Sequence, residues 1–290
     1  MALLGARSSP IRRVLAEYRV QLAFTYALFA VEMLGSLLRP YFLGVAVNGL
    51  LAGDYHGLVV LSVVHLAWII IGTARHMYDT RTFSAIYTTF VTRMLSRPAD
   101  GDELSKRSAL SNLARQVTDF LAYDVNYVAE AVYNIGGSLL FLLAYDRAVV
   151  GICLAILVPV TLLGRRYGRT VARLNREEFD ELERQVDIIG THDAAEIAGH
   201  YSRLRSWQVR ISDREAWNFG STELFVLICV AGSLVVSTRT VKVPLEAGSI
   251  IGMYAYLLKF ASGLETIPYT VQRLGALRDI LRRVSEAQEG

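Results

Sequence analysis

The sequence predicts an all-α integral membrane protein with six transmembrane helices and long helical extensions into the cytoplasm. Hydrophobic residues make up 53% of the 290 residues, and the mean hydropathy is positive. A soluble chain of this size would be less apolar. Apolar runs long enough for most of a membrane crossing recur along the chain, and polar stretches with helical periodicity continue them. These features together favour a helical membrane protein over a soluble domain.

Six segments are predicted to cross the membrane, each mostly apolar and bounded by turn residues or polar stretches. The predicted spans are residues 20–51, 58–95, 108–145, 148–189, 201–237 and 249–274. Short turns at 52–57, 146–147 and 238–248 connect them on one side of the membrane. No long linker or low-complexity segment separates the spans, so residues 1–290 are expected to form one domain.

The first two spans carry a few charged residues among their apolar ones. Glu32 and Arg39 are seven residues apart in the first span, and therefore lie on one helix face. Arg75 and Asp79 in the second span are four apart and can pair on the surface of their helix. Pairing of Glu32 with Arg39 would be a structural explanation for these charges, and a polar cavity would be a functional one.

The third span carries a polar stripe. Its residues advance by three or four and so share one helix face. They are Asp119, Tyr123, Asn126, Tyr127, Glu130 and Asn134. Asp124 lies off this stripe. Because charges at membrane depth are costly unless they face protein or water, the stripe predicts a wet, mostly acidic cavity. Structural pairing between helices is the alternative.

The fourth and fifth spans are expected to extend far beyond the membrane. The uncharged apolar run from Val149 to Gly164 continues into a polar stretch with helical spacing. Its spacing is typical of a seam that packs against another helix. The seam residues are Ala172, Asn175, Phe179, Leu182, Val186 and Ile189. A helix from Val149 to Ile189 would be about 60 Å long, twice the bilayer core. Residues 191–199 then form a tip, and the polar stretch 201–218 leads back to the membrane.

The sixth span is interrupted by Lys259, Glu265 and Pro268. The first, third and sixth spans carry ionisable groups at membrane depth, whereas the second, fourth and fifth have clean apolar runs. We therefore expect the first, third and sixth helices to line an interior. Pairing of Glu265 with Lys259 is the structural alternative.

The distribution of Lys and Arg predicts the orientation. Among the three short turns, the first has neither residue, the second has Arg147, and the third has Arg239 and Lys242. The opposite side holds many more, beginning with Arg12 and Arg13. By the positive-inside rule, both termini and both long tips are expected on the cytoplasmic side of the cell inner membrane.

Catalytic and metal chemistry is not expected. Cys153 and Cys229 both lie in apolar runs and are expected to be buried small residues, neither a disulfide nor a metal pair. His192, Glu196 and His200 are spaced by four and could place three metal ligands on one helix face. A solvated polar tip is the favoured alternative, because no second shell of residues supports such a site.

The sequence contains no catalytic triad and no G-x-x-x-x-G-K-[ST] loop for ATP. No enzyme activity, cofactor or nucleic-acid partner is therefore expected of these residues.

Several segments resemble the transmembrane domain of an ABC exporter of the half-transporter kind. Residues 38–54 resemble that family's first helix and outer turn, and 93–98 resemble the end of its second helix. Residues 184–216 are similar to a divergent subfamily of six-helix ABC membrane regions. The resemblance covers nearly the whole chain. It implies a domain-swapped homodimer that works by alternating access in the lipid bilayer.

The polar groups at membrane depth give the candidate site residues. Those expected to form the substrate or proton pathway are Glu32, Asp119, Tyr123, Asp124, Asn126, Glu130, Asn134 and Glu265. Those expected to act as coupling elements at the cytoplasmic tips are Pro98, Asp102, His192, Ala195 and Glu196. The expected function is export of an amphipathic or peptide-like small molecule.

In the family a nucleotide-binding domain follows the sixth helix, whereas this sequence ends about fifteen residues beyond it. The resemblance therefore implies an ATPase domain on a separate chain. The alternatives are a proton-driven transporter with the same fold and a non-transporting membrane scaffold.

Overall fold

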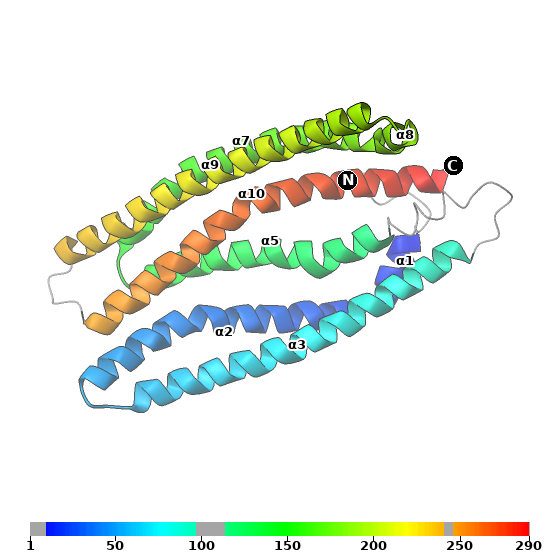
Figure 1. Ribbon diagram of the computed structural model, residues 1–290. Helices are drawn as coiled ribbons and strands as arrows, with labels where there is room; N and C mark the ends of the chain where they lie inside the picture. The colour runs from blue at the N-terminus through cyan, green and yellow to red at the C-terminus, as the bar shows by residue number, and fades with distance from the viewer. Residues whose placement is uncertain (1–9, 97–113, 241–245, 290) are drawn as a thin grey trace. The chain divides into compact units, whose positions relative to one another are not determined.

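A computed structural model describes residues 10–96, 114–240 and 246–289 of the chain. The expected coupling residues Pro98 and Asp102, and the start of the predicted third span, lie outside these ranges. Every regular element of the described chain is a helix (Figure 1). The chain divides into two compact units. The first contains residues 1–137, 245–255 and 273–290, and the second contains residues 138–244 and 256–272.

A helical hairpin dominates the first unit. The short helix α1 (Pro10–Glu17) precedes α2 (Arg19–Leu51), which packs along α3 (His56–Leu95) (Figure 1). At the turn between α2 and α3, Gly53 has φ of +77°, a conformation that suits glycine. Asp54 accepts a hydrogen bond of 2.9 Å from the His56 backbone N–H at the start of α3. These two residues explain the sharp reversal.

The third predicted span is helical but irregular. Residues 114–119 are α-helical, and the π-helical turn η1 (Phe120–Asp124) leads into α5 (Val125–Val132). A second π-helical turn, η2 (Tyr133–Gly137), leads into α6 (Ser138–Leu142). In η1 the Val125 N–H donates to the carbonyl of Phe120, five residues earlier. Each wider turn breaks the regular helical spacing, and such turns are frequent at functional sites.

Apolar side chains and close glycine contacts hold the first unit together. The buried residues Val14, Phe83, Ile86, Phe90 and Ala114 form one cluster, which joins α1, α3 and the start of the third segment. Elsewhere the beginning of α10 (Ala247–Glu289) meets the end of α2. A Cβ at Gly248 would overlap the carbonyl oxygen of Gly44, so the absence of a side chain at Gly248 permits this close approach of the two helices.

The second unit is built on a long antiparallel pair, α7 (Arg147–Glu183) and α9 (Ala194–Thr240) (Figure 1). The predicted continuous helix through residue 189 is interrupted at Arg184, after which α8 (Gln185–Gly190) runs to the turn. In that turn His192 has φ of 55°.

The structure moves the start of the fifth helix from residue 201 to Ala194. Asp193 accepts a hydrogen bond of 2.7 Å from the Ala195 backbone N–H. This cap favours helix formation from Ala194 onward.

The packing between α7 and α9 uses a different face of α7 from the predicted seam. Cys153 and Cys229 are buried and free, with their Sγ atoms 3.7 Å apart, so the expectation of buried cysteines is confirmed. By contrast, Phe179 is 64% exposed and Val186 is 79% exposed. Leu182 and Ile189 are exposed as well. The apolar seam is therefore uncovered by the described part of this chain.

Four helical stretches are long and apolar enough to cross a membrane. They are Arg19–Leu51, His56–Arg93, Arg147–Gly190 and Ala194–Arg239. On α3 the apolar residues Val59, Val63, Leu66 and Ile70 are all exposed and recur at helical spacing. Such a surface suits lipid better than water. Among the described residues, the predicted third and sixth spans are not helices long and apolar enough to meet the same criterion. The polar stripe lowers the hydropathy of the third.

Candidate substrate pocket

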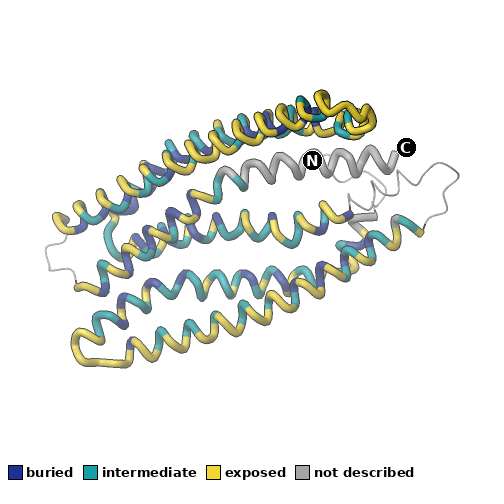
Figure 2. The backbone as a smooth tube through the Cα atoms, viewed as in Figure 1, coloured by how far each residue is buried: buried dark blue, intermediate teal, exposed yellow. Residues whose placement is uncertain are grey.

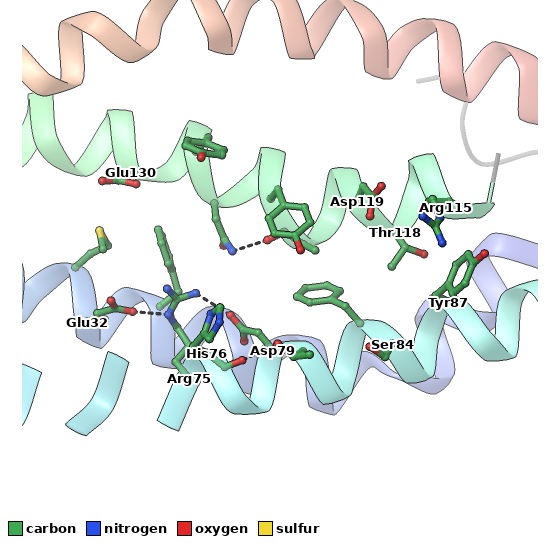
Figure 3. Close-up of a pocket in the computed structure, with 18 of the residues that line it drawn as sticks. Glu32, Arg75, His76, Asp79, Ser84, Tyr87, Arg115, Thr118, Asp119 and Glu130 are labelled. Atoms are coloured by element: carbon green, nitrogen blue, oxygen red, sulfur yellow. Dashed lines mark hydrogen bonds and ion pairs between the residues drawn. The ribbon is translucent and has the colours of Figure 1, made fainter. Parts of the chain in front are cut away.

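A pocket of about 650 Å³ lies within the first unit, between α2, α3 and the third helical segment (Figure 3). Pockets of this volume suit small-molecule ligands. Its ionisable lining residues are Glu32 of α2, Arg75, His76 and Asp79 of α3, and Arg115, Asp119 and Glu130 of the third segment. Three helical segments that are distant in the sequence therefore contribute charge to one cavity.

An ion cluster joins α2 to α3 at the wall of this pocket. The Arg75 Nε–H donates to Glu32, and the Arg75 guanidinium donates a second hydrogen bond of 2.7 Å to Asp79 (Figure 3). The side chains of all three residues are only 12–17% exposed. The Arg75 guanidinium also lies 5.3 Å from the centre of the Phe29 ring. One guanidinium thus pairs with two carboxylates that are largely shielded from water.

This cluster corrects one sequence interpretation. Glu32 pairs with Arg75 of the neighbouring helix, and Arg39 instead lies 4.5 Å from the centre of the Trp68 ring. The idea of a Glu32–Arg39 pair is therefore wrong. The second predicted span was not expected to line an interior, yet its residues Arg75 and Asp79 line the pocket.

Five of the six residues in the predicted polar stripe line the pocket. They are Asp119, Tyr123, Asn126, Tyr127 and Glu130. The sixth, Asn134, is buried and outside the lining. It lies within η2, where the wider turn removes it from the regular spacing. Asp124 is buried and outside the lining too, which agrees with its position off the stripe.

The third segment places two carboxylates in the lining that form no ion pair with any described residue. Asp119 is exposed and Glu130 is partly buried. Asn126 donates a hydrogen bond of 2.8 Å to the Ala122 carbonyl, while its own side-chain oxygen is buried without a donor among the described residues. These groups give the pocket an excess of hydrogen-bond acceptors.

Sequence reasoning missed much of the α3 wall. Trp68, His76 and Tyr87 line the pocket, as do Arg75 and Asp79. The available signal was the pair of opposite charges, four residues apart, in an otherwise apolar helix. We interpreted that pair as a local contact, although it also marks the face of α3 that turns toward α2 and the third segment.

The structure places Glu265 in the second unit. There it lines a different pocket of about 550 Å³, with Tyr167 of α7, Glu215 and Thr222 of α9, and Tyr269 of α10. Glu265 itself is exposed. Glu265 and the stripe of the third segment therefore line different pockets. The predicted role of Glu265 in a substrate or proton pathway stays a prediction.

The three expected coupling residues that the structure describes lie at the α8–α9 turn. The tube is coloured mostly as exposed around this turn (Figure 2). His192, Ala195 and Glu196 are all exposed. His200 is completely buried, and its Nδ1 lies 2.8 Å from Glu181 Oε1. Since His192 precedes the helix and His200 points into the α7–α9 contact, the three spaced residues do not gather as metal ligands. No such cluster occurs within the described ranges.

Comparison with protein families gives one match. The family model described as ABC transporter transmembrane region matches residues 11–248. This range includes α2, α3, the third segment, α7, α8 and α9. The comparison with curated proteins gives no match.

Proposed function

Because the chain belongs to the family of ABC transporter transmembrane regions, we propose that it is the membrane subunit of an exporter. Its substrate in this proposal is an amphipathic or peptide-like small molecule, moved by alternating access. The subunit itself carries no catalytic activity. In this proposal an ATPase domain on a separate chain drives the transport, and the 290 residues themselves contain no Walker loop.

The observation that carries this proposal is the exposed turn at the end of the long α7–α9 pair. The uncharged run 149–164 is most of a membrane crossing, yet α7 and α8 continue to Gly190. At 1.5 Å per residue, the end of α8 lies about 40 Å along the helix beyond that run. A rigid pair of this length can carry a motion from an ATPase at the turn to the membrane.

A second copy of the chain would complete the transporter. The seam residues Phe179, Leu182, Val186 and Ile189 form an exposed apolar strip on α7 and α8. Apolar strips with this spacing are typically covered by another helix. In our proposal a domain-swapped homodimer covers them, each protomer crosses the inner membrane six times, and both termini are cytoplasmic.

Cross-linking in native membranes tests the proposed ATPase contact. A cysteine at Ala195, in the cytoplasmic turn, should cross-link to a protein that contains Walker loops. A cysteine at Tyr55, which is 66% exposed in the α2–α3 turn and on the outer side of the membrane in our proposal, should not. The native Cys153 and Cys229 are buried and should not compete for the reagent. Cross-links to such a protein from residue 55 alone, or from neither position, would contradict the proposal.

One observation favours a second candidate, a proton-driven transporter with the same fold. Glu130 is a partly buried carboxylate at the pocket, and no described residue forms an ion pair with it. Carboxylates that face a polar cavity inside the membrane are typical members of proton pathways in transporters. A non-transporting scaffold is distinguished from both candidates by the absence of any solute flux in reconstituted vesicles.

A further inference from the structure

The charges around the first-unit pocket do not cancel. Its lining contains four carboxylates and two guanidinium groups. Arg75 is held by Glu32 and Asp79, and Arg115 lies 5.5 Å from the centre of the Tyr87 ring. This leaves Asp119 and Glu130 without an ion-pair partner among the described residues. A cationic ligand would be attracted to this lining, and an anionic one would be repelled.

Aromatic rings line the same pocket as these carboxylates. The aromatic lining residues are Phe29, Trp68, Phe83, Tyr87, Tyr123 and Tyr127. The protein's own arginines already lie over Phe29, Trp68 and Tyr87, so cation–π contacts form readily in this part of the chain. Tyr123 and Tyr127 are exposed and lie on the same segment as Asp119 and Glu130.

An independent observation is a buried acceptor on the same helical segment. The side-chain oxygen of Asn126 is buried and has no hydrogen-bond donor among the described residues. Asn126 lines the pocket, between Asp119 and Glu130 in the sequence. A buried acceptor without a donor is costly, and a positive charge held nearby in the pocket would reduce that electrostatic cost.

We propose that this pocket binds organic cations with an aromatic or apolar body. Asp119 and Glu130 supply the attraction for the charge, and the surrounding rings contact the body of the ligand. The inference rests on the proposed function, in which the bound ligand is the transported substrate. It narrows that substrate from amphipathic molecules in general to cationic ones. Binding itself can be measured without transport.

The test uses two probes of the same shape and opposite charge. Tetraphenylphosphonium is a permanent lipophilic cation, and tetraphenylborate is the corresponding anion. Equilibrium dialysis of the detergent-purified full chain, corrected for empty micelles, should show saturable binding of the cation only. Glu130→Gln and Asp119→Asn should each weaken that binding by on the order of tenfold, the effect of one nearby charge in a partly desolvated site.

The matched control is Glu183→Gln, which removes the same charge from an exposed position in the second unit. It should bind the cation like the wild type. Equal binding of the two probes, no saturable binding, or equal weakening by Glu183→Gln would overturn the inference. None of these outcomes concerns ATPase docking, so the proposed exporter role would stand or fall separately through the Ala195 cross-link.

Discussion

The Glu32–Arg75–Asp79 cluster and the Glu181–His200–Arg203 cluster both join two helices through charged hydrogen bonds, but their surroundings differ. In the first, one arginine holds two carboxylates, and all three side chains are at most 17% exposed. In the second, Glu181 accepts hydrogen bonds of 2.8 Å from His200 and Arg203. Arg203 is 50% exposed, so part of this second cluster reaches water.

This difference indicates different roles: the first cluster forms part of a pocket wall, and the second holds two helices together. The first cluster interrupts helices that are otherwise apolar enough to cross a membrane, a setting in which charges are costly. It also lines a pocket with further carboxylates. The second lies on the long extension beyond the run 149–164, close to the α8–α9 turn. We infer that it fixes the geometry of that turn.

The largest effect is expected from Arg75→Met. This variant leaves Glu32 and Asp79 facing each other without their shared cation. Removing one partner of a buried charge cluster typically costs about 3 kcal/mol or more. We expect a loss of that size in the free energy of unfolding, measured in detergent by chemical denaturation followed by circular dichroism.

The combination Arg75→Met with Glu32→Gln and Asp79→Asn serves as the control for Arg75→Met. It removes all three charges and should recover most of the lost stability, because no unpaired carboxylate remains. If Arg75→Met is as stable as the wild type, the cluster is not buried in the way the structure indicates.

A smaller effect is expected from Glu181→Gln. The change removes the charge that His200 and Arg203 share, but Arg203 can turn toward water. Loss of charged hydrogen bonds of this kind costs about 2 kcal/mol. The same unfolding measurement should therefore rank this variant between Arg75→Met and the wild type. A loss as large as that of Arg75→Met would remove the distinction between the two clusters.

The sequence was sufficient for the helical segments because its signals are local. Apolar runs and three-to-four spacing predicted helices in the positions of α2, α3, α7 and α9, and the family match supports the membrane assignment. The same spacing brought five stripe residues to one pocket. The π-helical turns were not predictable, since a five-residue turn leaves no regular pattern of residue types. Asn134 lies in the second of these turns and does not line the pocket with the other five.

Ion-pair partners were less predictable because they depend on packing between helices. Glu32 has Arg39 on its own helix, yet its partner Arg75 is 43 residues away in the sequence. His200 was grouped with His192 and Glu196 by spacing alone. The turn at His192 ends that regularity, and packing of α9 on α7 brings His200 to Glu181 instead.

The smallest effect on stability, and the sharpest effect on function, is expected from Glu130→Gln. Glutamine has nearly the same size, and no described ion pair is lost, so the free energy of unfolding should change by less than about 0.5 kcal/mol. If the transporter is proton-driven, this variant should abolish solute accumulation in vesicles with an imposed pH gradient, because the glutamine cannot titrate. Asp124→Asn should have a weaker effect, since Asp124 lies outside the pocket lining.

Normal accumulation by Glu130→Gln under the gradient would refute proton coupling through this residue. So would wild-type flux that survives collapse of the gradient and stops only when ATP is withdrawn. That second result would instead support the ATP-driven exporter, with Glu130 retained as a charge that attracts the substrate.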